Sequence, residues 1–281
     1  MGRFRPKRTV RLVAHLRGAF PEQVPSWKRE EEGLSRELHD RWSALHRHCA
    51  DQSSHLRLGR LIHRLMHYDP GVRESALAEL ELATQLICAG VRVTFLPESQ
   101  ARTADLECCL GRERFFVEIT AMVGSSALRR VPLRVMARGD ERSEEEDRGV
   151  ILIHRILARI QQKAKQLADY SDPVVLTISI PRADLRSGVN SRREEIWLDL
   201  KTLSGAVTLL LTKLCHLSAV LIVLWDVEPL PSKAGTRLAN VELVERAKHQ
   251  RTQPRVRLLI QNPGAIAGLS EQMTDVCRET L

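Results

Sequence analysis

The stretch RTADLECCLGRERFFVEIT (Arg102–Thr120) decides how this chain folds, because it predicts two paired strands. Two otherwise apolar runs, which carry Asp105, Glu107 and Glu118, lie on either side of a tight turn at Leu110–Glu113, and this pattern is typical of a hairpin. With this turn Asp105 lies opposite Glu118, whereas a shift of one residue would put the two carboxylates on opposite faces. Facing carboxylates on adjacent strands repel, so the unshifted register indicates a cation between them.

The segments around the hairpin predict an α/β fold. A hairpin followed by strands that are linked through helices indicates a mixed sheet with helices on both faces. We expect residues 121–149 to form a charged surface loop and the last strand to precede a short tail. The expected strands are 91–98, 172–180, 219–227 and 255–263, and the expected helices are 74–90, 150–168 and 194–203, with a further apolar helix after the last of these.

The N-terminal part is expected to be helical and basic. Residues 1–70 hold 14 of the Lys and Arg residues against 8 Asp and Glu, which accounts for most of the net charge of +8. We expect residues 1–68 to form a basic helical N-terminal region and residues 69–281 to form the α/β domain. The basic region suits a polyanion such as nucleic acid, and the alternative is a solvated basic helical surface.

Cysteine usage and hydropathy point to a soluble, cytoplasmic protein. The six cysteines form no C-x-x-C pair and lie at no zinc-finger spacing to the histidines, so we expect free thiols and a reducing compartment. The N-terminus has no uninterrupted apolar core of the secretory kind. The longest apolar run, Leu217–Trp225, is about half of the roughly 20 residues that span a bilayer, so we expect no membrane contact.

Three segments around the hairpin resemble the PD-(D/E)XK, or restriction-endonuclease-like, nuclease superfamily. The segments ALAELELATQLICAG, TADLECCL and FFVEIT resemble, in order, its glutamate-bearing helix, its aspartate strand and its Glu-x-Lys strand. The segment RLMHYDPGVRESALAEL is similar to the lead-in of bacterial members, and RLLIQNPGA to their late strand. The resemblance covers roughly residues 61–265 and implies a restriction-endonuclease-like fold for the α/β domain.

The resemblance implies a metal site on the hairpin. Asp105 and Glu118 match the two metal-binding carboxylates of the family, and Glu79 matches the glutamate of its helix, with Glu81 as the alternative. Hard oxygen ligands suit Mg²⁺ or Mn²⁺, and Mg²⁺ usually takes one or two carboxylates together with substrate phosphate oxygens and water. The resemblance therefore implies that Asp105, Glu118 and Glu79 hold the metal.

The resemblance breaks at Thr120, which stands where the family has its catalytic lysine. A substitute is expected from helix 150–168, because Lys163 lies at the edge of its apolar face, close to Arg159 one turn before. Lys165 points away from that face and is the second choice. We therefore expect Lys163 to assist the attacking water in place of the missing lysine.

Two functions follow from the resemblance. The first is a magnesium-dependent endonuclease that hydrolyses phosphodiester bonds in DNA. The alternative is a catalytically inactive nuclease-fold domain that binds nucleic acid or scaffolds a protein complex. In either case the basic N-terminal helices would lie against the phosphate backbone, or against a second copy or a partner subunit.

Overall fold

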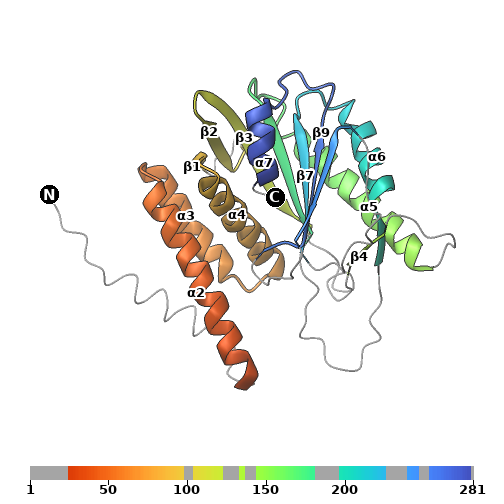
Figure 1. Ribbon diagram of the computed structural model, residues 1–281. Helices are drawn as coiled ribbons and strands as arrows, with labels where there is room; N and C mark the ends of the chain where they lie inside the picture. The colour runs from red at the N-terminus through yellow and green to blue at the C-terminus, as the bar shows by residue number, and fades with distance from the viewer. Residues whose placement is uncertain are drawn as a thin grey trace.

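The computed structural model describes residues 25–97, 104–122, 133–136, 144–180, 196–225, 239–246 and 253–279 (Figure 1). Its centre is a seven-stranded mixed sheet with the strand order β1-β2-β3-β5-β7-β9-β8. The inner strands β3, β5 and β7 run parallel, and the remaining pairs are antiparallel. The strands are β1 (Arg92–Phe95), β2 (Leu106–Leu110), β3 (Glu113–Ala121), β5 (Val174–Ile180), β7 (Ala219–Leu224), β8 (Val241–Glu245) and β9 (Val256–Gln261).

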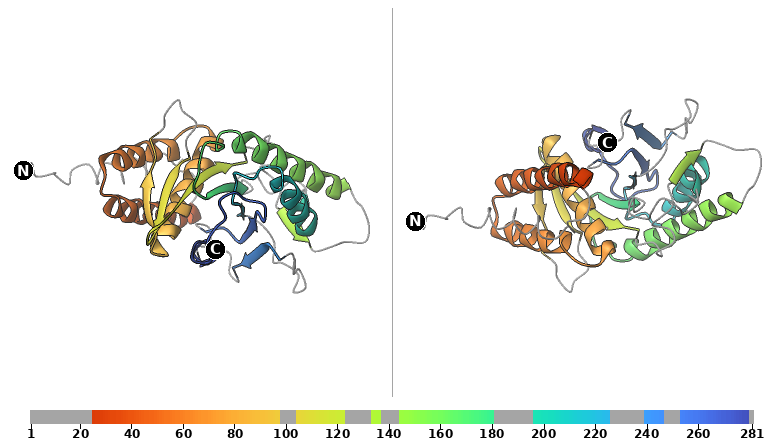
Figure 2. Two further views of the ribbon diagram at one scale, coloured as in Figure 1. Left: turned by 90° about the horizontal axis from the view of Figure 1, so that it is seen from above. Right: turned by 90° about the horizontal axis from the view of Figure 1, so that it is seen from below.

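Helices pack on both faces of this sheet, so the predicted α/β class is confirmed. Alternation along β7 sends Val220 and Ile222 into a core with α5 and α6, and Ala219 and Leu221 into a core with α2, α3, α4 and α7. Figure 2 shows α2 and α3 beside β1 and β2 at one end of the molecule, and α5 and α6 toward the other. The helices are α2 (Pro25–His48), α3 (Gln52–Leu65), α4 (Pro70–Cys88), α5 (Glu144–Ala164), α6 (Leu200–Leu211) and α7 (Glu271–Glu279).

The hairpin forms with the predicted register. β2 and β3 pair so that Leu110 lies opposite Glu113 and Glu107 opposite Phe116. The tight turn between them needs a left-handed residue, and Gly111 supplies it at φ 61°. One residue beyond the last pair, the Asp105 N–H donates to the Val117 carbonyl at 3.1 Å. Asp105 and Glu118 therefore lie beside each other at the open end of the hairpin.

The expected loop at residues 121–149 is wrong in part. β4 (Leu133–Met136) lies within it and pairs in parallel with β6 (Ile196–Asp199), and α5 already begins at Glu144. The sequence prediction started this helix only at residue 150, where its apolar periodicity becomes clear.

The C-terminal half differs from expectation in three further places. The helix expected at 194–203 begins as β6, and α6 starts only after Asp199, whose side chain accepts a hydrogen bond from the Lys201 N–H at 2.9 Å. Strand β8 and helix α7 were not predicted. Both elements are short, and each has too few apolar residues to show a period in the sequence. These residues are explained only by the structure, in which β8 pairs with β9 and α7 packs on one face of the sheet.

The described N-terminal helices are part of the main core. Leu45 of α2 and Leu58 and Leu61 of α3 are fully buried in one cluster with Leu80 of α4 and strands of the sheet. The boundary expected after residue 68 therefore does not separate two cores within the described chain, and residues 1–24 lie outside it. None of the described helices is both long enough and apolar enough to cross a membrane.

Candidate active site

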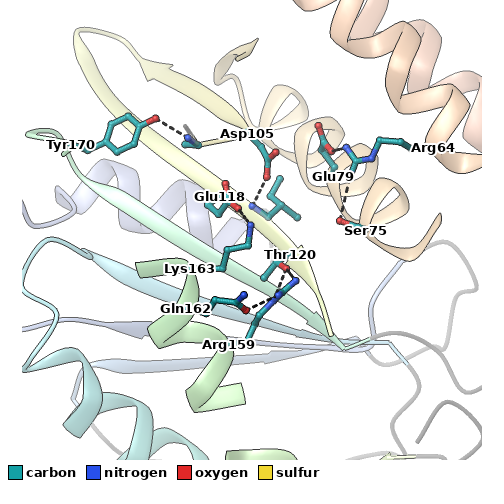
Figure 3. Close-up of polar contacts among 12 residues, drawn as sticks. Arg64, Ser75, Glu79, Asp105, Glu118, Thr120, Arg159, Gln162, Lys163 and Tyr170 are labelled. Atoms are coloured by element: carbon teal, nitrogen blue, oxygen red, sulfur yellow. Dashed lines mark hydrogen bonds and ion pairs between the residues drawn. The ribbon is translucent and has the colours of Figure 1, made fainter. Parts of the chain in front are cut away.

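Three carboxylates converge at the open end of the hairpin. Glu118 lies on the face of β3 that α5 covers, Asp105 precedes β2, and Glu79 approaches from α4 (Figure 3). Tyr170 fixes the start of β2, because its hydroxyl accepts a hydrogen bond from the Ala104 N–H at 2.7 Å. The Ile119 N–H donates to Asp105 Oδ2 at 2.8 Å, which ties the aspartate to β3.

Lys163 reaches this site from the last turn of α5. Its Nζ lies 2.5 Å from Glu118 Oε1, and the lysine side chain keeps 20% of its surface exposed. Ile160 and Ala164 on either side are fully buried, so the edge position that the helix periodicity predicts brings the amine over the sheet. Lys165 lies beyond the end of α5 and is exposed. The structure therefore brings Lys163, and not Lys165, to the carboxylates.

A second cation of α5 contacts Thr120, two residues after Glu118 on β3. Arg159 donates to Thr120 Oγ1 from Nε at 3.0 Å and from Nη2 at 2.7 Å, and its Nη1 donates to Gln162 Oε1 at 2.9 Å. Figure 3 shows Arg159 and Lys163 pointing from one helix toward two residues of one strand. Arg159 and Lys163 together set two positive charges along β3.

The sequence prediction missed two arginines of α3. Arg57 Nη2 lies 3.0 Å from Asp105 Oδ1 and 3.2 Å from Glu79 Oε1, and Arg64 Nη1 lies 2.6 Å from Glu79 Oε2. Arg57 is buried in the same stripe of α3 as Leu58 and Leu61. A charged residue within an apolar helical stripe was the available signal, since a buried arginine needs a carboxylate partner.

The two candidate glutamates of α4 have different partners. Glu79 lies beside Asp105, whereas Glu81 forms an ion pair with Arg257 of β9 in the interior of the sheet face that α4 covers. Both side chains of this second pair are almost fully buried. Glu79 is thus the glutamate that joins the site, and Glu81 belongs to a separate buried ion pair.

The arrangement fits a cation held by two carboxylates. Within the described ranges, no three His, Cys, Asp or Glu side chains are spaced to hold one metal ion together. Asp105 and Glu118 are nonetheless both hard oxygen donors, and Mg²⁺ usually needs only one or two protein carboxylates. Glu79 contacts both Arg57 and Arg64, whereas Asp105 contacts Arg57 and Glu118 contacts Lys163, so Glu79 is the carboxylate whose charge is most fully matched without a metal.

Burial and the neighbouring carboxylate of Asp105 raise the pKa values of two glutamates of the site. Burial and the neighbouring Asp105 carboxylate raise the pKa of Glu118 from 4.5 to about 7, although Lys163 opposes the shift. The same two causes raise the pKa of Glu79 to about 7 against the pull of Arg57 and Arg64. Both glutamates lie beside Asp105, so an additional positive charge near Asp105 would lower the pKa of each.

The raised pKa of Glu118 predicts how stability depends on pH without metal. Between about pH 4.5 and 7 the folded protein binds more protons than the unfolded chain, so its free energy of unfolding falls as pH rises. In the presence of a metal chelator, the free energy of unfolding of Glu118→Gln should decrease by about 1–2 kcal/mol less than that of wild type over this pH range. The measurement is the Tm of both proteins from pH 4.5 to 8. Equal pH profiles for the two proteins would contradict the prediction.

Comparisons with protein-family models, with curated proteins and with solved structures found no match for this chain. Its function is therefore inferred from the residues of the site.

Proposed function

We propose that this protein is a metal-dependent nuclease of the PD-(D/E)XK type that hydrolyses phosphodiester bonds in DNA. The observation that carries the proposal is the contact of Lys163 with Glu118, beside Asp105 on the same hairpin. Two carboxylates and an amine at this position are what the superfamily pattern requires, with the amine supplied from α5 in place of Thr120. A restriction-endonuclease-like form of the α/β fold is part of this proposal.

The residues of the chain divide the work between metal binding and charge compensation. Asp105 and Glu118 would hold Mg²⁺ or Mn²⁺, which when bound supplies an activated water and stabilises charge on the phosphate. Lys163 has three N–H donors and uses one for Glu118, so another is available to orient the attacking water or a phosphate oxygen. Arg159 lies next along β3 and adds positive charge where the phosphodiester would lie.

DNA is the proposed partner because positive charge borders the site. Arg159 and Lys163 line one side of β3, and the chain carries a net charge of +8. Such charge attracts the phosphate backbone without reading base sequence. The proposed nuclease therefore acts on DNA whose backbone passes across the open end of the hairpin.

The direct test is a cleavage assay on supercoiled, linear and single-stranded DNA with Mg²⁺ or Mn²⁺. Wild type should cleave, and an Asp105→Ala, Glu118→Ala double variant should lose about 10³-fold or more of the rate, because no metal is held. Glu107→Ala is the matched control, since Glu107 lies on β2, two residues after Asp105 and opposite Phe116, and its loss should leave the rate unchanged. Circular dichroism checks that each variant folds.

The second candidate function is a nuclease-fold domain that binds nucleic acid without cleaving it. Thr120 at the lysine position, held by Arg159, is the observation that favours it. Wild type that binds DNA but cleaves no faster than the double variant would overturn the nuclease and support this candidate.

A further inference from the structure

Arg57 shares one nitrogen between two carboxylates of the site. Its Nη2 lies 3.0 Å from Asp105 Oδ1 and 3.2 Å from Glu79 Oε1, and its side chain is only 4% exposed. The arginine belongs to α3, whereas its partners belong to α4 and to the start of β2. Helix α3 therefore places a permanent positive charge between the carboxylates of Glu79 and Asp105.

The two contacts of this nitrogen are not equivalent. The contact with Asp105 Oδ1 is an aligned hydrogen bond. The contact with Glu79 is an ion pair only, and within the described part of the chain Glu79 Oε1 accepts no hydrogen bond. A buried carboxylate oxygen without a donor is costly, so Glu79 Oε1 is ready to accept one.

A metal at Asp105 would meet Arg57 directly. Asp105 Oδ2 already accepts from the Ile119 N–H, and Oδ1 is the oxygen that Arg57 holds. A divalent ion and a guanidinium repel each other at such short range in a buried site. Arg57 must therefore give up Asp105 Oδ1 when a metal takes it.

We infer that Arg57 occupies the metal's place at Asp105 in the metal-free protein, and that Glu79 is the acceptor to which Arg57 moves when a metal binds. This inference rests on the proposed metal-dependent function. Glu79 is then a positioning residue and not a metal ligand. Arg64 holds the other oxygen of Glu79 at 2.6 Å, which keeps Oε1 turned toward Arg57.

The inference predicts that the effect of Glu79 on metal affinity depends on the presence of Arg57. The experiment measures the Kd for Mn²⁺ by calorimetry on the full chain without DNA. Arg57→Met should tighten Mn²⁺ binding about tenfold, because a competing charge is removed. Glu79→Gln should weaken binding about tenfold when Arg57 is present and less than about threefold in the Arg57→Met background. In the Glu79→Gln variant, the side-chain oxygen of the glutamine would accept a hydrogen bond from Arg64. The side-chain nitrogen would then face Arg57 and offer it no acceptor.

Controls separate the possible outcomes. Arg60→Met removes an exposed arginine from the same helix and should leave the Kd unchanged. An equal loss from Glu79→Gln in both backgrounds would overturn the inference, because Glu79 would then act on the metal independently of Arg57. Wild type that binds no Mn²⁺ would instead overturn the proposed function. Arg57→Gln, which is also neutral, replaces Arg57→Met if the latter does not fold.

Discussion

Replacing Lys163 with methionine should lower the rate of DNA cleavage about 10²–10³-fold while leaving Mn²⁺ affinity equal or tighter. Lys163 contacts Glu118 through its amine. Methionine keeps most of the lysine side-chain volume but removes the charge. The proposed role of the amine is to orient the water and offset charge on the phosphate, so its loss affects the chemical step. The measurement is the single-turnover cleavage rate at saturating Mn²⁺.

Lys165→Met is the matched control for this experiment. Lys165 lies two residues further along, is exposed, and loses the same charge on substitution. It should leave the cleavage rate within about twofold of wild type, since an exposed charge away from the site is screened. Cleavage by Lys163→Met at the rate of Lys165→Met would show that Lys163 is only a counter-ion of Glu118, and Arg159 would then be the remaining cation beside β3.

Replacing Glu81 with leucine should destabilise the protein by about 3–5 kcal/mol. Its partner Arg257 is 1% exposed and is among the largest fully buried side chains of the described chain. Removing the glutamate leaves a buried guanidinium without its carboxylate, which is the costly way to break a buried pair. The measurement is the free energy of unfolding in urea, together with the cleavage rate of the folded fraction.

Two further variants test this explanation. Glu81→Leu combined with Arg257→Met should recover most of the lost stability, because it removes both charges. Asp275→Ala breaks the exposed pair of Asp275 with Arg278 on α7 and should cost less than about 1 kcal/mol. If the double variant is as unstable as Glu81→Leu alone, packing and not charge explains the loss. Retained cleavage in the double variant would separate Glu81 from the active site.

Local sequence patterns predicted the parts of the site that depend on short-range geometry. The alternation of strand residues and the turn at Gly111 place Asp105 next to Glu118 wherever the hairpin lies in the fold. The period of α5 likewise puts Lys163 at the edge of a buried face. Neither prediction needed knowledge of another element, and the structure agrees with both positions.

The choice between Glu79 and Glu81 needed the tertiary structure. Helix α4 lies between the sheet and the helices α2 and α3, so residues 78–84 are buried without interruption and periodicity does not distinguish one side from another. Only the positions of Asp105, just before β2, and of Arg257, on β9, decide which glutamate meets which partner.

The sequence by itself determined that Asp105 and Glu118 lie side by side on a hairpin of an α/β sheet and that Lys163 lies at the edge of a buried helix face, because strand and helix periods fix the directions of nearby side chains. Only the tertiary structure decided which charges surround them. Arg57 reaches Asp105 from 48 residues away, and this contact depends on how α3 packs against α4 and β1. Such a contact leaves no periodic signal, so residues that the sequence presented as a basic helical surface became part of the site.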